Sequence, residues 1–98
     1  MSEAQKRSDK DHRPQIAELS VGVAVAQARN KLLARLHQKG FGAFLSRHEI
    51  LGMLEEERFE VIKAVHGESL EQLREELLDV AVGCIFAVAC IDEKALDW

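Results

Sequence analysis

The sequence predicts an all-α protein: a helical bundle that is built on an antiparallel helix hairpin and completed by homo-oligomerisation. Its composition of 47% apolar, 31% charged and 5% aromatic residues, with one Pro, is typical of helical proteins. Apolar residues recur at steps of three and four along three long segments. Two of these segments open with a serine capping signature, at Ser46 and Ser69. A chain of 98 residues has room for one such domain.

The N-terminal segment differs in composition from the rest of the chain. Residues 1–13 are polar and charged and show no periodicity, so we expect a disordered tail there. The single helical domain is then expected to span residues 14–98. Its first helix is predicted from Pro14, which suits a first helical turn, to Lys39, because Gly40 can end a helix.

This first helix carries apolar residues on two sides. The first stripe contains Ile16, Leu19, Val23, Ala26 and Leu33, and the second contains Val21, Val25, Ala28, Leu32 and Leu36. A helix that is apolar on two sides must be covered on two sides, and one small domain has too few elements to do so. We therefore expect the chain to associate with itself, as a homodimer or a homotetramer.

The second and third helices are predicted to form the hairpin. Ser46 and Glu49 have the spacing of a capping box, and the helix that they open is expected to end near Gly67. Ser69 and Gln72 repeat this pattern and open a helix that continues to about Ile91. The connection is so short that the two helices should lie antiparallel and in contact.

Acidic residues lie inside the apolar stripes of both hairpin helices. Glu57 and Glu60 are three residues apart and share a helix face, and so are Glu76 and Asp79. Each pair is about two helical turns from the connection, so the four carboxylates should meet at one height. Like charges repel, and a buried carboxylate is costly unless it is paired or bound to metal. These four residues are therefore predicted to bind Mg²⁺, with Mn²⁺ as a possible substitute; the alternative is that they form ordinary solvated helix faces.

Composition argues against several other kinds of protein. The net charge of −4 leaves no basic surplus for a nucleic-acid partner. The longest apolar stretch, residues 80–91, is too short to cross a bilayer, and the polar N-terminal segment does not resemble a signal peptide. Cys84 and Cys90 lie six residues apart in one predicted helix, where a disulfide is disfavoured. We therefore expect a cytoplasmic protein that binds neither nucleic acid nor membranes.

The paired acidic motif resembles one enzyme family. LEEERFEV at residues 54–61 and REELLDVA at residues 74–81 are similar to the two signature helices of the MazG-like all-alpha nucleoside triphosphate pyrophosphohydrolases. That superfamily includes dimeric dUTPases and dCTP pyrophosphatases. FLSRHE at residues 44–49 resembles a lead-in found in one branch of it. The resemblance covers roughly residues 15–91.

The resemblance implies Mg²⁺-dependent cleavage of a (deoxy)nucleoside triphosphate to the monophosphate and pyrophosphate. Glu56 is the leading candidate for the spare acid that orients the attacking water. Gln27, Asn30 and Lys31 on the first helix, together with Lys63, are candidate substrate contacts. Two alternatives stay open: a non-catalytic helical oligomerisation or adaptor module, and a family member that binds nucleotides without turnover.

One residue departs from the family pattern. Phe59 stands where many MazG-like proteins have Gly, just before the last Glu of the first motif. Its ring either lines the base pocket or fills core space, and we expect core packing because burial of a ring is stabilising with or without ligand. We also expect that neutralising Glu60 or Asp79 leaves the fold as stable or more stable, since it relieves repulsion among the acids.

Overall fold

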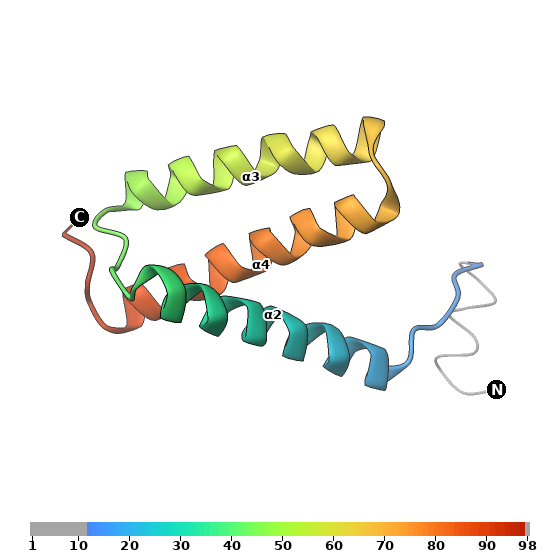
Figure 1. Ribbon diagram of the computed structural model, residues 1–98, viewed down its shortest axis with the longest axis horizontal. Helices are drawn as coiled ribbons and strands as arrows, with labels where there is room; N and C mark the ends of the chain where they lie inside the picture. The colour runs from blue at the N-terminus through green and yellow to red at the C-terminus, as the bar shows by residue number, and fades with distance from the viewer. Residues whose placement is uncertain (1–11, 98) are drawn as a thin grey trace.

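The structure is a computed structural model that describes residues 12–97. Its three helices are α2 (Glu18–Lys39), α3 (Arg47–Gly67) and α4 (Leu70–Asp92), and residues 12–97 contain no strand. Both α2 and α3 pack against α4, and these two outer helices do not pack against each other. Figure 1 shows α4 between its two neighbours, with α3 antiparallel to it. The all-α prediction and the helix hairpin are thus confirmed.

The proposed tail, residues 1–13, lies outside the described part of the chain except for His12 and Arg13, which are not helical. In residues 12–97, no helix has the length and apolar character needed to cross a bilayer. The thiols of Cys84 and Cys90 are both free, as their spacing predicts.

Helix α2 begins four residues later than the sequence predicts. Pro14 lies in an extended segment, and the helix starts at Glu18, after Ala17. Ala17 has no side-chain acceptor, and its backbone carbonyl accepts hydrogen bonds from the amides of Ser20 and Val21 instead. The predicted start at Pro14 is therefore wrong: Pro suits a first turn but does not itself cap the helix. The end at Lys39 is as predicted, and Gly40 follows with φ of 102°.

Both serine caps form as predicted. Ser46 Oγ accepts the amide of Glu49 at 3.2 Å, and Ser69 Oγ accepts the amide of Gln72 at 3.1 Å. The Glu49 carboxylate in turn accepts a hydrogen bond from the amide of Leu45, one residue before the cap, at 3.3 Å. These bonds satisfy amides that a helix start otherwise leaves without partners, so the sequence fixes the starts of both hairpin helices.

The C-terminal segment turns back after α4. Lys94 adopts a left-handed backbone with φ of 57°, and the amide of Ala95 bonds to the carbonyl of Cys90 at 2.9 Å. This hydrogen-bond pattern is that of a Schellman helix end. The amide of Asp97 then bonds to the carbonyl of Leu45 at 2.6 Å. The chain end therefore lies beside the start of α3 (Figure 1).

A close approach sets the register of α3 against α4. A Cβ atom at Gly83 would lie only 2.6 Å from Met53 Sδ, so the Met53 side chain of α3 occupies the space that Gly83 leaves on α4. Because the helices are antiparallel, four residues beyond Met53 on α3 correspond to four residues before Gly83 on α4. These positions are Glu57 and Asp79, which places the acidic residues of the two helices at the same height.

The core of the single chain contains small residues. The buried apolar residues are Ala28, Ala64, Val82, Ala87 and Cys90. Large apolar side chains on all three helices stay exposed, among them Leu19 at 79% and Leu77 at 52%. Phe59 is 64% exposed, so its predicted burial is wrong for the single chain. The reason is angular: α3 turns Glu57 and Ala64 toward α4, and Phe59 lies well around the helix from both.

Candidate functional site

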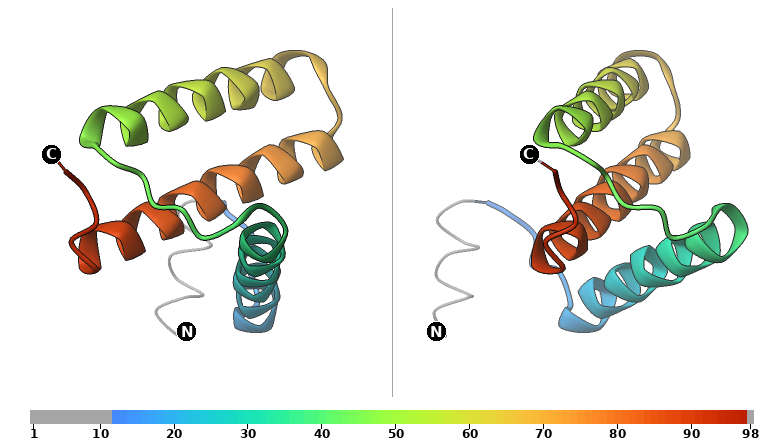
Figure 2. Two further views of the ribbon diagram at one scale, coloured as in Figure 1. Left: turned by 60° about the vertical axis from the view of Figure 1, so that its left-hand side comes forward. Right: turned by 90° about the vertical axis from the view of Figure 1, so that its left-hand side faces the viewer.

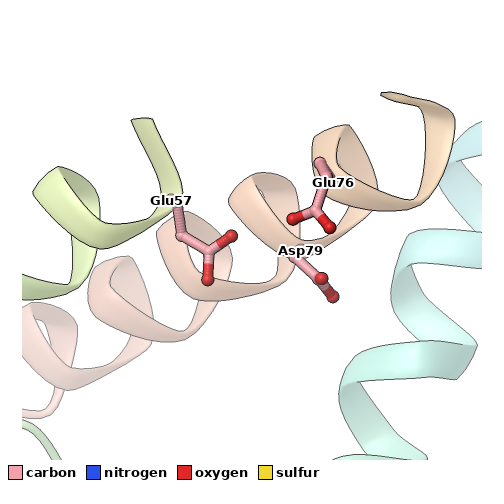
Figure 3. A group of neighbouring side chains, drawn as sticks. All are labelled: Glu57, Glu76 and Asp79. Atoms are coloured by element: carbon pink, nitrogen blue, oxygen red, sulfur yellow. The ribbon is translucent and has the colours of Figure 1, made fainter. Parts of the chain in front are cut away.

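Three of the four predicted metal ligands come together. Glu57 on α3 and Glu76 and Asp79 on α4 each offer a carboxylate oxygen, and these three oxygens all lie within 4.8 Å of one another. Figure 3 shows the carboxyl groups of Glu76 and Asp79 along one side of α4, with the Glu57 side chain extending toward them from α3. All three residues are half-buried. Glu60 is also half-buried, but its carboxylate does not belong to the group.

Glu57 is the residue of the group that most lacks a partner. Its Oε2 atom is buried and accepts no hydrogen bond from any described residue. Burial raises the pKa of the Glu57 carboxyl, and the nearby charges of Asp79 and Glu76 raise it further. A buried carboxylate oxygen in this position is short of a cation or a proton donor.

Asp79 is in the opposite electrostatic condition. Its Oδ1 atom lies 2.8 Å from Lys31 Nζ and 3.0 Å from Arg35 Nη2, both on α2. Burial disfavours the charged form of Asp79, but the hydrogen bonds from Lys31 and Arg35 outweigh it and hold the pKa of Asp79 below its usual range. The side chain is only 23% exposed, so these two cations compensate a charge that water reaches poorly.

Lys31 joins two acids of α4. It contacts Asp79 and also Glu75 Oε2, at 3.0 Å. Partial burial alone would lower the pKa of Lys31, but the two carboxylates outweigh that effect and raise it. The site therefore has a row of cations on α2 next to a group of acids that α3 and α4 supply. Figure 2 shows α2 crossing the hairpin on the side of α4 away from α3.

A cavity of about 160 Å³ adjoins the acids. Glu57, Asp79 and Arg35 contribute its polar wall. Phe44 and Phe86, whose ring centres are 5.8 Å apart, belong to its apolar wall. The cavity is smaller than the ~300–1,000 Å³ usual for a small-molecule site, so a ligand the size of a nucleotide would extend out of it along the charged surface.

The other predicted site residues lie outside this group. Glu56 and Lys63 are exposed on α3, and Asn30 is exposed on α2. Gln27 accepts a hydrogen bond from Arg74, which ties α2 to the start of α4. Of the predicted substrate contacts, only Lys31 lies within reach of the acids.

Sequence reasoning did not predict that Arg35 pairs with Asp79 or that Glu75 pairs with Lys31. The signal was present: Lys31 and Arg35 are four residues apart, as are Glu75 and Asp79, so each pair occupies one helix face. What the sequence does not state is that α2 packs on this side of α4.

The donor set suits a hard divalent cation. Oxygen ligands from carboxylates are those that Mg²⁺ and Mn²⁺ prefer, and the partnerless Glu57 oxygen is available to such an ion. Comparison with known proteins adds no further assignment: no family model, no curated protein and no solved structure matches this chain.

Proposed function

We propose that the protein is a MazG-like, Mg²⁺-dependent nucleoside triphosphate pyrophosphohydrolase that acts as a homo-oligomer and cleaves (d)NTP to (d)NMP and pyrophosphate. The observation that carries the proposal is the convergence of Glu57, Glu76 and Asp79 from the two motif-bearing helices, with a buried Glu57 oxygen that has no described partner. An acidic helix face exposed to solvent would not need such convergence.

The acids and the cations would have separate tasks. Glu57, Glu76 and Asp79 would hold Mg²⁺, which supplies charge neutralisation and a more acidic bound water. Lys31 and Arg35 border the same acids and would bind phosphate oxygens of the substrate. In the reaction, the water oxygen bonds to the α-phosphorus, the α–β bridging bond breaks, and pyrophosphate leaves.

The attacking water needs a group that orients it and takes its proton. Glu56 is exposed and outside the acidic group, so the structure offers it no support in this role. Glu60 is half-buried and one helical turn beyond Glu57. We therefore assign the water-orienting role to Glu60 rather than Glu56. Glu60→Gln should then abolish turnover while Glu56→Gln keeps it.

The test of the function is a pyrophosphate-release assay on a panel of nucleoside triphosphates with Mg²⁺. Wild type should release pyrophosphate from at least one of them. Glu57→Gln and Asp79→Asn should lose that activity, and Glu55→Gln, an exposed acid of the same helix, should keep it as the matched control.

Two other results would replace the proposal. If Mg²⁺ and nucleotide raise the melting temperature but no pyrophosphate appears, the protein binds nucleotides without turnover. If neither Mg²⁺ nor nucleotide changes the melting temperature and no substrate is cleaved, the chain is a helical oligomerisation or adaptor module.

A further inference from the structure

The side of α4 that points away from Asp79 is apolar and uncovered. Leu77, Ile85 and Val88 lie on it and are 52%, 45% and 56% exposed. Because each residue advances about 100° around a helix, Leu77 and Asp79 point about 160° apart. We call this surface, from Leu77 to Val88, the rear face of α4.

Open grooves border the rear face on both sides. The groove toward α2 has a volume of about 380 Å³ and is lined by Val25, Ala28 and Ile85 among others. The groove toward α3 has a volume of about 460 Å³ and is lined by Leu54, Val61 and Val80 among others. Leu77 belongs to the walls of both grooves, so the apolar surface continues from α2 across α4 to α3. The charged residues that line the two grooves are Arg74 in the first and Glu55, Glu57 and Arg58 in the second.

A surface of this kind needs a second layer. Since α2 and α3 pack only against α4 among the described helices, the three helices form an open layer. Stable domains bury a helix layer against another layer, and soluble monomers seldom leave a large continuous apolar surface in water.

We propose that a second copy of this chain covers the rear face, with the two α4 helices antiparallel about a two-fold axis between Val82 and Gly83. Positions equally far from that axis then meet. Leu77 faces Val88 of the second copy, and Ala81 faces Cys84 of the second copy, where the small side chains allow close approach. The apolar surface is thus complementary to itself, as a two-fold interface requires.

Charge complementarity identifies the occupant as a second copy. Arg74 and Asp92 are 18 residues apart, which is five turns at about 3.6 residues per turn, so both lie along the same edge of the rear face. In the antiparallel pair, this edge of one α4 meets the same edge of the other. Asp92 lies one position farther from the two-fold axis than Arg74 does, an offset of about 1.5 Å along the helix. The long Arg74 side chain spans this offset, so Arg74 of each copy pairs with Asp92 of the other and the dimer has two equivalent ion pairs.

Arg74 can make this contact without giving up its present ones. Its side chain is 52% exposed and already reaches Gln27 and Glu75. A guanidinium has five N–H donors, so further bonds remain available to it. The proposed interface lies on the side of α4 opposite Asp79, and of the three grouped acids only Glu57 lines a groove beside it. Formation of the dimer does not depend on the metal or the nucleotide.

Sedimentation equilibrium tests the proposed face. Wild type should have twice the 11.0 kDa chain mass at micromolar concentration. Val88→Glu should raise the dimer dissociation constant on the order of a hundredfold, because each copy would place a charge in an apolar interface. The matched control is Leu19→Glu, which adds the same charge at a 79% exposed position of α2 and should leave the dimer intact.

A monomeric wild type would overturn the proposal. So would a dimer that Leu19→Glu dissociates and Val88→Glu does not, because the interface would then lie on α2.

A charge exchange tests the register without altering the apolar surface. Arg74→Glu should raise the dissociation constant about tenfold, since it places two acids opposite each other. Adding Asp92→Arg to the same chain should restore wild-type affinity within about threefold, because each ion pair reforms with its charges exchanged. Circular dichroism confirms that the variants keep their helix content. Failure of the second substitution to restore affinity would overturn the antiparallel register.

Discussion

The two helix contacts of this protein use different chemistry. Where α3 meets α4, the approach depends on shape, because Gly83 leaves room for Met53. Where α2 meets α4, long charged side chains span the contact: Lys31 and Arg35 of α2 form ion pairs with Asp79 of α4. The shape-based contact favours one register, since a shift of one residue would bring a side chain against Met53. The charge-based contact tolerates adjustment, because long side chains can follow their partners.

This difference explains the position of the candidate site. The α3–α4 contact fixes Glu57 opposite Asp79, and the α2–α4 contact then gives Asp79 ion pairs with Lys31 and Arg35. The charge of Arg35 also acts on Glu57, but without a hydrogen bond to its buried oxygen. One acid is therefore compensated within the chain, and the other lacks a partner among the described residues. The predictions below test each contact separately.

The largest effect on stability is expected at Gly83. Gly83→Val adds three carbon atoms where one Cβ would already lie 2.6 Å from Met53 Sδ. We expect a loss of about 1–3 kcal/mol in the free energy of unfolding, measured by urea denaturation. Gly52→Ala is the matched control, since nothing lies within 4 Å of an added Cβ there, and it should gain about 0.5–1 kcal/mol from helix propensity. Equal stability of the Gly83→Val variant and wild type would show that the end of the Met53 side chain, which supplies the close atoms, moves aside without loss.

Neutralising Asp79 and neutralising Glu57 should change the free energy of unfolding in opposite directions. Asp79→Asn removes the partner of Lys31 and Arg35 and should cost about 1–2 kcal/mol in metal-free protein. The ion pairs thus reverse the sequence-based expectation that neutralising Asp79 is harmless.

Glu57→Gln removes a buried carboxylate without a described partner. The amide that replaces it can donate to Asp79 or Glu76, so stability should rise by about 1 kcal/mol. Thermal unfolding in a metal chelator measures both substitutions. A stabilised Asp79→Asn variant would mean that its ion pairs contribute nothing and that acid repulsion dominates.

The predictability of each part follows from how local its determinants are. The starts of α3 and α4 depend on Ser46 and Ser69, whose partners lie three residues away, so a sequence pattern was sufficient. The acidic group depends on the short connection and the antiparallel register, and three of its four predicted members converge. The packing of α2 joins residues 44 positions apart, such as Lys31 and Glu75, and no local pattern contains that information. Helix α2 also begins without a capping side chain, which is why its start was misplaced.

That last point leads to a prediction about α2. Ala17 has the extended backbone of a capping residue, with φ of −66° and ψ of 139°, but lacks an acceptor. Ala17→Ser should therefore stabilise the protein by about 0.5–1 kcal/mol. Ser46→Ala, the converse change on α3, should cost about 1 kcal/mol because the backbone amide of Glu49 loses the Ser46 oxygen that accepts it. Thermal unfolding of both variants measures the pair. No gain from Ala17→Ser would place the true start of α2 elsewhere.

The smallest effect is expected at Phe59. Because its side chain is 64% exposed and faces away from α4, Phe59→Ser removes little packing within the chain. The free energy of unfolding should change by no more than about 0.5 kcal/mol, as at most surface positions. The proposed dimer contact on the rear face of α4 does not include Phe59, so the dissociation constant should also stay unchanged. A loss above about 2 kcal/mol, typical of a buried ring, would show that another surface covers Phe59 in the folded protein. Parallel sedimentation of Phe59→Ser would then reveal whether that cover is a further copy of the chain, and hence whether the assembly is larger than a dimer.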